Sequence, residues 1–153
     1  MRTLILILLC LFILSSHCLA QKNYVVSPEV HQSIQPFVYE IRDFVSTIPN
    51  INNAEFNIFI KDLKSALIYF SAALFDIYCM IDIESSHYPE TNKKSIFIIQ
   101  TVIQQRLDEV EKAITSFSKP VSSQDVTAYA KQTIGYLKQV KLLLIRIKEE
   151  LPS

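Results

Sequence analysis

The sequence predicts an all-α protein, arranged as a four-helix up-down-up-down antiparallel bundle that follows a cleaved signal peptide. The chain contains a single glycine, Gly135, and six prolines. So few turn residues do not suit the frequent tight turns of a β-sandwich or barrel. Apolar residues also recur at alternating spacings of three and four, which places them along one face of a helix.

Residues 1–20 have the three parts of a secretory signal. Arg2 gives a basic start, residues 4–14 are an unbroken apolar run, and a more polar stretch ends at the small residue Ala20. The alternative is an uncleaved anchor, but a spanning helix needs roughly 20 apolar residues and this run is shorter. We therefore expect cleavage between Ala20 and Gln21, and secretion of residues 21–153 as one extracellular helical-bundle domain.

The first helix is expected over approximately residues 27–48, where Ser27 is the N-cap and Pro28 the first helical residue. Pro36 lies inside this range and predicts either a kink or a start delayed to about Ser33. The apolar stripe of this helix comprises Val30, Ile34, Phe37, Ile41, Phe44 and Ile48.

The second helix is expected over approximately residues 53–83 and is apolar nearly all round, since Asp76 is the only charged residue between Ser65 and Ile81. That stretch resembles a marginal membrane span, but it is shorter than about 20 residues and has charged neighbours, so we expect a buried central helix and no integral span in the mature chain. Its main stripe comprises Ile60, Leu63, Leu67, Phe70, Leu74, Ile77 and Ile81. A second row at seven-residue spacing comprises Phe59, Ala66, Ala73 and Met80.

The last two helices are expected over approximately residues 91–117 and 123–151, after a polar connection over residues 84–94. Ser122 and Asp125 resemble a capping box for the final helix. Gly135 falls within that helix, where it costs about 1 kcal/mol relative to alanine but can allow close packing. The third stripe comprises Ile96, Ile99, Ile103, Leu107, Val110, Ile114 and Phe117, and the fourth comprises Val126, Ala130, Thr133, Leu137, Val140, Leu144, Ile147 and Leu151.

Composition and motifs argue against several functions. With 15 basic and 15 acidic residues the chain is neutral, so we expect no nucleic-acid partner. One glycine cannot build a phosphate loop or a nucleophile elbow, so we expect no enzyme activity and no cofactor. Glu84, His87 and Glu90 would share a helical face as metal ligands, but Pro89 and two serines favour a solvated loop there, and we expect no metal site.

Two further features allow more than one interpretation. Cys10 and Cys18 leave with the signal, so Cys79 stands alone as either an interchain thiol or, as we expect, a small buried hydrophobe that stays reduced. The last helix contains a run of basic residues. In the simpler interpretation they occupy a solvent-exposed face of the helix; in the alternative they bind an anionic head group or a partner. This run comprises Lys131, Lys138, Lys141, Arg146 and Lys148.

The surplus of apolar residues on the second helix suggests a function. We expect a secreted, non-enzymatic helical binding protein, favoured as a monomer, that carries or sequesters a lipid-like apolar small molecule against this helix. The alternatives are a secreted protein–protein interaction module, for signalling or directed at a host, that uses an exposed helix face, and simple close packing against the alanines. The candidate ligand-binding residues are Phe59, Ala66, Phe70, Ala73, Leu74 and Met80.

Overall fold

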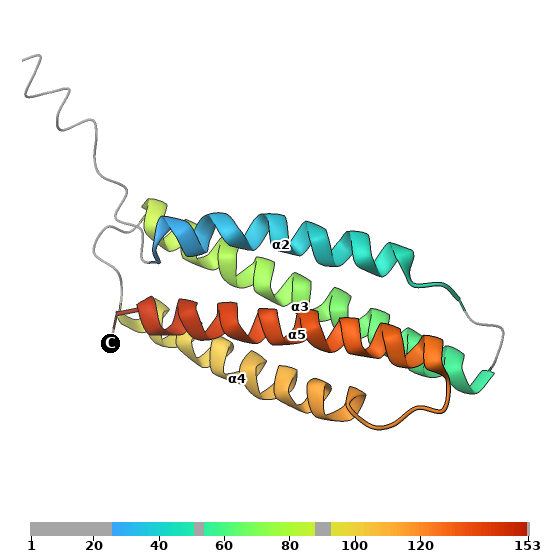
Figure 1. The fold of residues 1–153 in the computed structure, drawn as a ribbon. Helices are drawn as coiled ribbons and strands as arrows, with labels where there is room; N and C mark the ends of the chain where they lie inside the picture. Colours follow the sequence, from blue (N-terminus) through green and yellow to red (C-terminus); the bar gives the residue numbers. More distant parts are fainter. Residues whose placement is uncertain (1–25, 51–53, 88–92, 153) are drawn as a thin grey trace, which may run out of the picture.

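The computed structural model of the chain describes residues 26–50, 54–87 and 93–152. Over these residues the secondary structure consists of four α-helices and no strand, which confirms the all-α prediction (Figure 1). The helices are α2 (Pro28–Thr47), α3 (Ala54–His87), α4 (Lys93–Phe117) and α5 (Gln124–Glu150). The expected signal segment, residues 1–20, lies outside the described residues.

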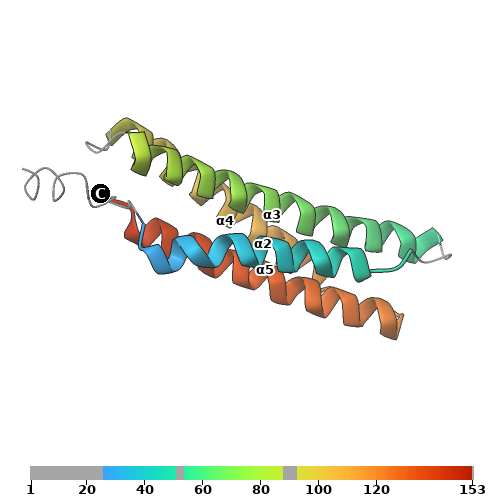
Figure 2. The same cartoon turned by 90° about the horizontal axis from the view of Figure 1, so that it is seen from above.

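The four helices lie side by side as a bundle (Figures 1 and 2). Helix α2 packs on α3 and α4 packs on α5, while α3 also contacts both α4 and α5. Helix α3 therefore makes most of the contact between the two halves of the bundle, and α5 also contacts α2.

The core is built from the four predicted stripes. Every stripe residue of α3 and of α5 is buried, including Leu67 and Leu137, which have no exposed surface. In α2 and α4 the stripes are also buried, except that Phe44, Leu107 and Ile114 are only partly covered. Val26, just before α2, adds a further buried side chain to the same core.

Two serines cap helices at their N-termini. Ser27 Oγ accepts a hydrogen bond from the backbone N–H of Val30 over 3.4 Å, so α2 begins at Pro28 and continues through Pro36 without the delayed start considered above. In α5 the cap is Ser123, whose Oγ accepts from Val126 N over 3.5 Å. The expected cap at Ser122 is therefore wrong by one residue.

Helix α3 continues to His87, four residues beyond the expected end near Ile83. Residues 84–87 include neither glycine nor proline, so nothing in the backbone stops the helix until Pro89 disfavours helical geometry at the residue before it. Gly135 also differs from expectation, because a methyl group added there would meet nothing within 4 Å. Close packing does not explain the glycine.

The two ends of the helical region meet at one end of the bundle. Ser27 Oγ donates to Glu150 Oε1 over 3.0 Å, and the Ser27 backbone N–H donates to Glu150 Oε2 over 2.5 Å. At the same end, Gln100 Nε2 donates to the carbonyl oxygen of Pro152 over 3.1 Å. These hydrogen bonds tie the start of α2 and the start of α4 to the end of α5.

Candidate functional site

The six candidate residues on α3 lie on two adjoining sides of the helix. Phe70 and Leu74 belong to the buried core stripe. Phe59, Ala66 and Met80 are partly buried against the core, and the Phe59 ring meets the edge of Phe117 in α4, with 5.8 Å between ring centroids. Phe59, Ala66 and Met80 therefore contribute to helix packing, whereas Ala73, the remaining candidate, is partly exposed.

A surface hollow of about 500 Å³ lies where α4 ends and α5 begins. Its volume falls within the roughly 300–1,000 Å³ typical of small-molecule sites. The floor is apolar, because Phe117 and Ala130 are buried and Val121 and Ile134 are partly buried. The lining comprises Phe117, Ser118, Lys119, Pro120, Val121, Thr127, Ala130, Lys131, Ile134 and Lys138.

Three exposed lysines, Lys119, Lys131 and Lys138, line this hollow, and no acidic residue does. Among the residues that the structure places, no carboxylate lies within ion-pair distance of these three ammonium groups. Lys131 and Lys138 are seven residues apart, so they extend from one face of α5 with Ile134 between them. We call this feature the lysine-rimmed hollow.

The basic residues of the last helix differ in their contacts. Lys141 Nζ lies 2.5 Å from Glu111 Oε2, and Lys148 Nζ donates to Gln104 Oε1 over 2.5 Å, so these two lysines tie α5 to α4. Arg146 lines a second, smaller hollow of about 260 Å³ between α2 and α5. Lys131 and Lys138 belong to the lysine-rimmed hollow.

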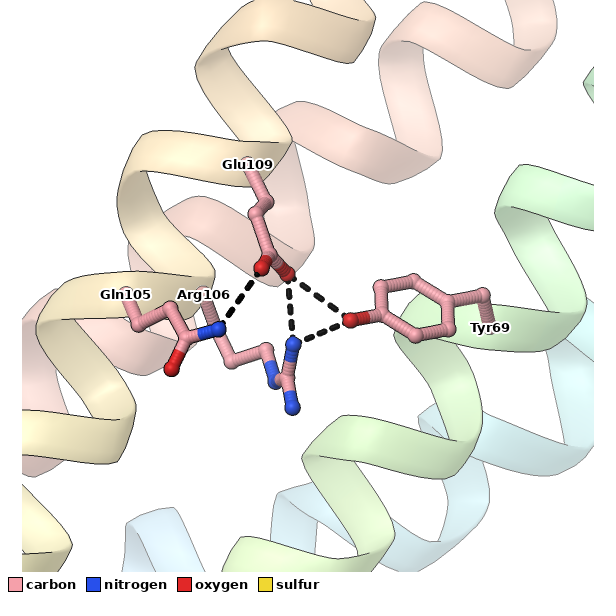
Figure 3. Close-up of polar contacts among 4 residues, drawn as sticks. All are labelled: Tyr69, Gln105, Arg106 and Glu109. Carbon is pink, nitrogen blue, oxygen red and sulfur yellow. Dashed lines mark hydrogen bonds and ion pairs between the residues drawn. The ribbon is translucent and has the colours of Figure 1, made fainter.

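A polar cluster joins α3 to α4 and was not anticipated from the sequence (Figure 3). Arg106 Nη1 lies 2.6 Å from Glu109 Oε2 and also donates to the hydroxyl of Tyr69. The Tyr69 hydroxyl donates to Glu109 Oε2 over 2.8 Å, and Gln105 Nε2 donates to Glu109 Oε1 over 3.0 Å. Arg106 and Glu109 are both partly covered here.

The electrostatics of this cluster favour a structural role. The hydrogen bond to Glu109, together with burial, raises the pKa of the Tyr69 hydroxyl. Burial opposes ionisation of Glu109, but hydrogen bonds from Arg106, Gln105 and Tyr69 outweigh it and lower the pKa of that carboxyl. Near neutral pH the tyrosine therefore keeps its proton and the glutamate its charge, so neither group is poised to exchange a proton.

Cys79 is partly exposed, so the expectation that it is buried is wrong. It lies on the side of α3 opposite the core stripe, where no other helix covers it completely. Burial, with Asp76 and Asp82 adding to it, raises the pKa of its thiol, and the reactive thiolate is therefore disfavoured.

The remaining candidate residues are the histidines. His31 lies against the ring of Tyr78, with 4.5 Å between centroids, and its Nε2 is 3.8 Å from Asp82 Oδ1. The side chains of Glu84, His87 and Glu90, considered above as metal ligands, lie outside the described part of the chain. Among the side chains that are placed, no group of three or more His, Cys, Asp or Glu residues could hold a metal ion.

Comparison of this chain with models of known protein families, with curated proteins and with solved structures finds no match. The described residues form an all-helical bundle that has an amphipathic, lysine-rimmed hollow and an interhelical polar cluster.

Proposed function

We propose that this protein is an exported, non-enzymatic binding protein that holds an anionic amphiphile, such as a fatty acid, in the lysine-rimmed hollow. The observation that supports the proposal most directly is the combination of an apolar floor with three lysines that have no acidic partner among the described residues. A single-chain amphiphile has the matching chemistry, since its head group is anionic and its tail is apolar.

Each part of such a ligand has a counterpart in the hollow. A carboxylate near Lys131 and Lys138 would accept charge-assisted hydrogen bonds, which are stronger than neutral ones. The hydrocarbon tail would cover Ile134, Ala130 and the edge of Phe117. Each methylene fully removed from water contributes about 0.8 kcal/mol, an upper limit here because the hollow is open on one side.

The proposed site differs from the α3 residues that the sequence suggested as the ligand site. Phe59, Ala66 and Met80 pack on the core, and Phe70 and Leu74 are within it. A ligand between α3 and α4 would have to displace contacts such as that between Phe59 and Phe117. Binding in the lysine-rimmed hollow requires no such displacement.

The test is isothermal titration calorimetry of the purified protein with palmitate below its micelle concentration. We expect the double substitution Lys131→Glu, Lys138→Glu to weaken binding by about tenfold or more, equivalent to a loss of about 1.4 kcal/mol. Lys112→Glu, at an exposed lysine outside the hollow, is the matched control and should leave binding unchanged. Equal affinities for wild type and the double variant, or no binding at all, would refute the proposed site.

We also propose that residues 21–153 are the exported form and that they fold as the up-down-up-down antiparallel bundle expected from the sequence. The short apolar run before Ala20 supports cleavage at that residue. Intact-mass measurement of the protein recovered from the medium of expressing cells should therefore give a chain that starts at Gln21. A product that retains Met1 or Arg2 would contradict cleavage.

A further inference from the structure

The side of α3 that faces away from the core carries large apolar side chains that are exposed. By length and composition, Phe56–Asp82 could cross a membrane, yet only 33% of its apolar window is buried inside the fold. Ile58 and Ile68 are 67% and 56% exposed, and Phe75 is 39% exposed. The sequence analysis allowed, as an alternative function, protein–protein interaction through an exposed helix face. These residues of α3 form such a face.

Residues on this side follow the seven-residue repeat of a coiled coil. One row comprises Ile58, Ser65, Ala72 and Cys79, and the other comprises Lys61, Ile68, Phe75 and Asp82. The two rows are offset by three residues, so they occupy the a and d positions through which helices pair. We call these eight residues the outer seam; six are exposed, and Cys79 and Asp82 are partly exposed.

We propose that the outer seam binds the outer seam of a second copy of this chain, with the two α3 helices antiparallel. In an antiparallel pair, a residues of one helix meet d residues of the other. Centred on Phe70, this register places Phe75 opposite Ser65 of the partner subunit and Ile68 opposite Ala72 of the partner subunit. Phe75 and Ile68, at the centre of the seam, then each meet a small side chain, which lets the two helices approach closely there.

Charge selects the antiparallel direction. The seam has Lys61 near one end and Asp82 at the other. A parallel pair would place each of these groups against its own copy, which is repulsive. The antiparallel pair instead places Lys61 opposite Cys79 of the partner subunit, within one helical turn of Asp82 of the partner subunit.

The same register creates two kinds of unfavourable contact. One places Ile58 opposite Asp82 of the partner subunit, and the other lies beside the seam. Asp62 and Asp76, on the neighbouring edge of the seam, come close to Asp76 and Asp62 of the partner subunit. These charges also argue against a membrane as the occupant, because Lys61, Asp62 and Asp76 would enter the hydrocarbon. At the rim of an interface between two proteins, these charged side chains stay in contact with water.

This interface lies on α3 and is independent of the lysine-rimmed hollow, which is lined by α4, α5 and their connection. The sequence analysis favoured a monomer, whereas this proposal gives a dimer. The two proposals can therefore fail separately, since a seam variant that no longer dimerises should still bind palmitate.

Sedimentation equilibrium of the purified protein measures the dimer directly. We expect Ile68→Glu to raise the dimer dissociation constant by about tenfold or more, as for the loss of a central interface residue. Ile98→Glu is the matched control, because Ile98 is a 49% exposed isoleucine on α4, and it should leave the constant unchanged.

Asp76→Lys should tighten the dimer. A protein that is monomeric at about 100 μM, far above typical specific dissociation constants, or that sediments with phosphatidylcholine vesicles, would overturn the proposal.

Disulfide trapping tests the direction of pairing. In the antiparallel register the two Cys79 residues are 18 positions out of alignment, or roughly 27 Å at 1.5 Å per residue, so the wild type should form no covalent dimer under oxidised glutathione. Lys61→Cys should form one through Cys79 of the partner subunit, and adding Cys79→Ser to that variant should abolish it. A wild-type dimer linked through Cys79 would show parallel pairing and overturn the register.

Discussion

Replacing Leu67 or Leu137 by alanine is expected to lower the free energy of unfolding by about 2–5 kcal/mol. Both side chains have no exposed surface, and they lie on α3 and α5, which contact each other across the core. Truncation removes apolar contacts and leaves a cavity that close-packed neighbours fill only in part. Urea unfolding followed by circular dichroism measures the change.

The matched control for these substitutions is Lys131→Ala. Lys131 is exposed on the same helix as Leu137, so its truncation should change stability by no more than about 0.5 kcal/mol. If the leucine and lysine variants lost equal stability, the buried face of the helices would have been assigned incorrectly.

Enlarging Ala66 to phenylalanine is expected to destabilise the protein by about 1–3 kcal/mol and to leave palmitate binding unchanged. Ala66 is partly buried against the core, in the row whose member Phe59 touches α4. A phenylalanine there would push α3 away from its neighbour, since interiors at native density do not absorb extra volume without strain.

Ala128→Phe is the control for this enlargement, because Ala128 is exposed on α5 and does not line the hollow. It should alter neither stability nor binding appreciably. If Ala66→Phe instead abolished palmitate uptake at unchanged stability, the ligand site would lie along α3, as the sequence suggested, and the lysine-rimmed hollow would be the wrong site.

The helices and their buried faces were predictable because periodicity is a local property of the sequence. The stripe of α5 shows this, since all its members from Val126 to Leu151 are buried. Errors arose where the local signal was ambiguous. Residues 84–87 are polar but contain no helix breaker, and either Ser122 or Ser123 is chemically able to cap α5.

The site was less predictable because it depends on which residues meet in space. Lys119 and Lys138 line one hollow although they belong to different segments. Tyr69 and Arg106 are hydrogen-bonded although 37 residues separate them. A single sequence does not show which polar face of one helix meets which face of another, so α3 was expected to be covered on every side, whereas its outer seam is exposed.

The hydrogen bonds between Ser27 and Glu150 have a consequence for how the chain could be rewired. These residues are 123 positions apart, yet they are in direct contact at one end of the bundle. A short linker could therefore join residues 26 and 152, and the chain could be reopened elsewhere without breaking a helix. The core thus does not depend on the order in which the four helices follow one another along the chain. A circularly permuted chain could therefore form the same fold.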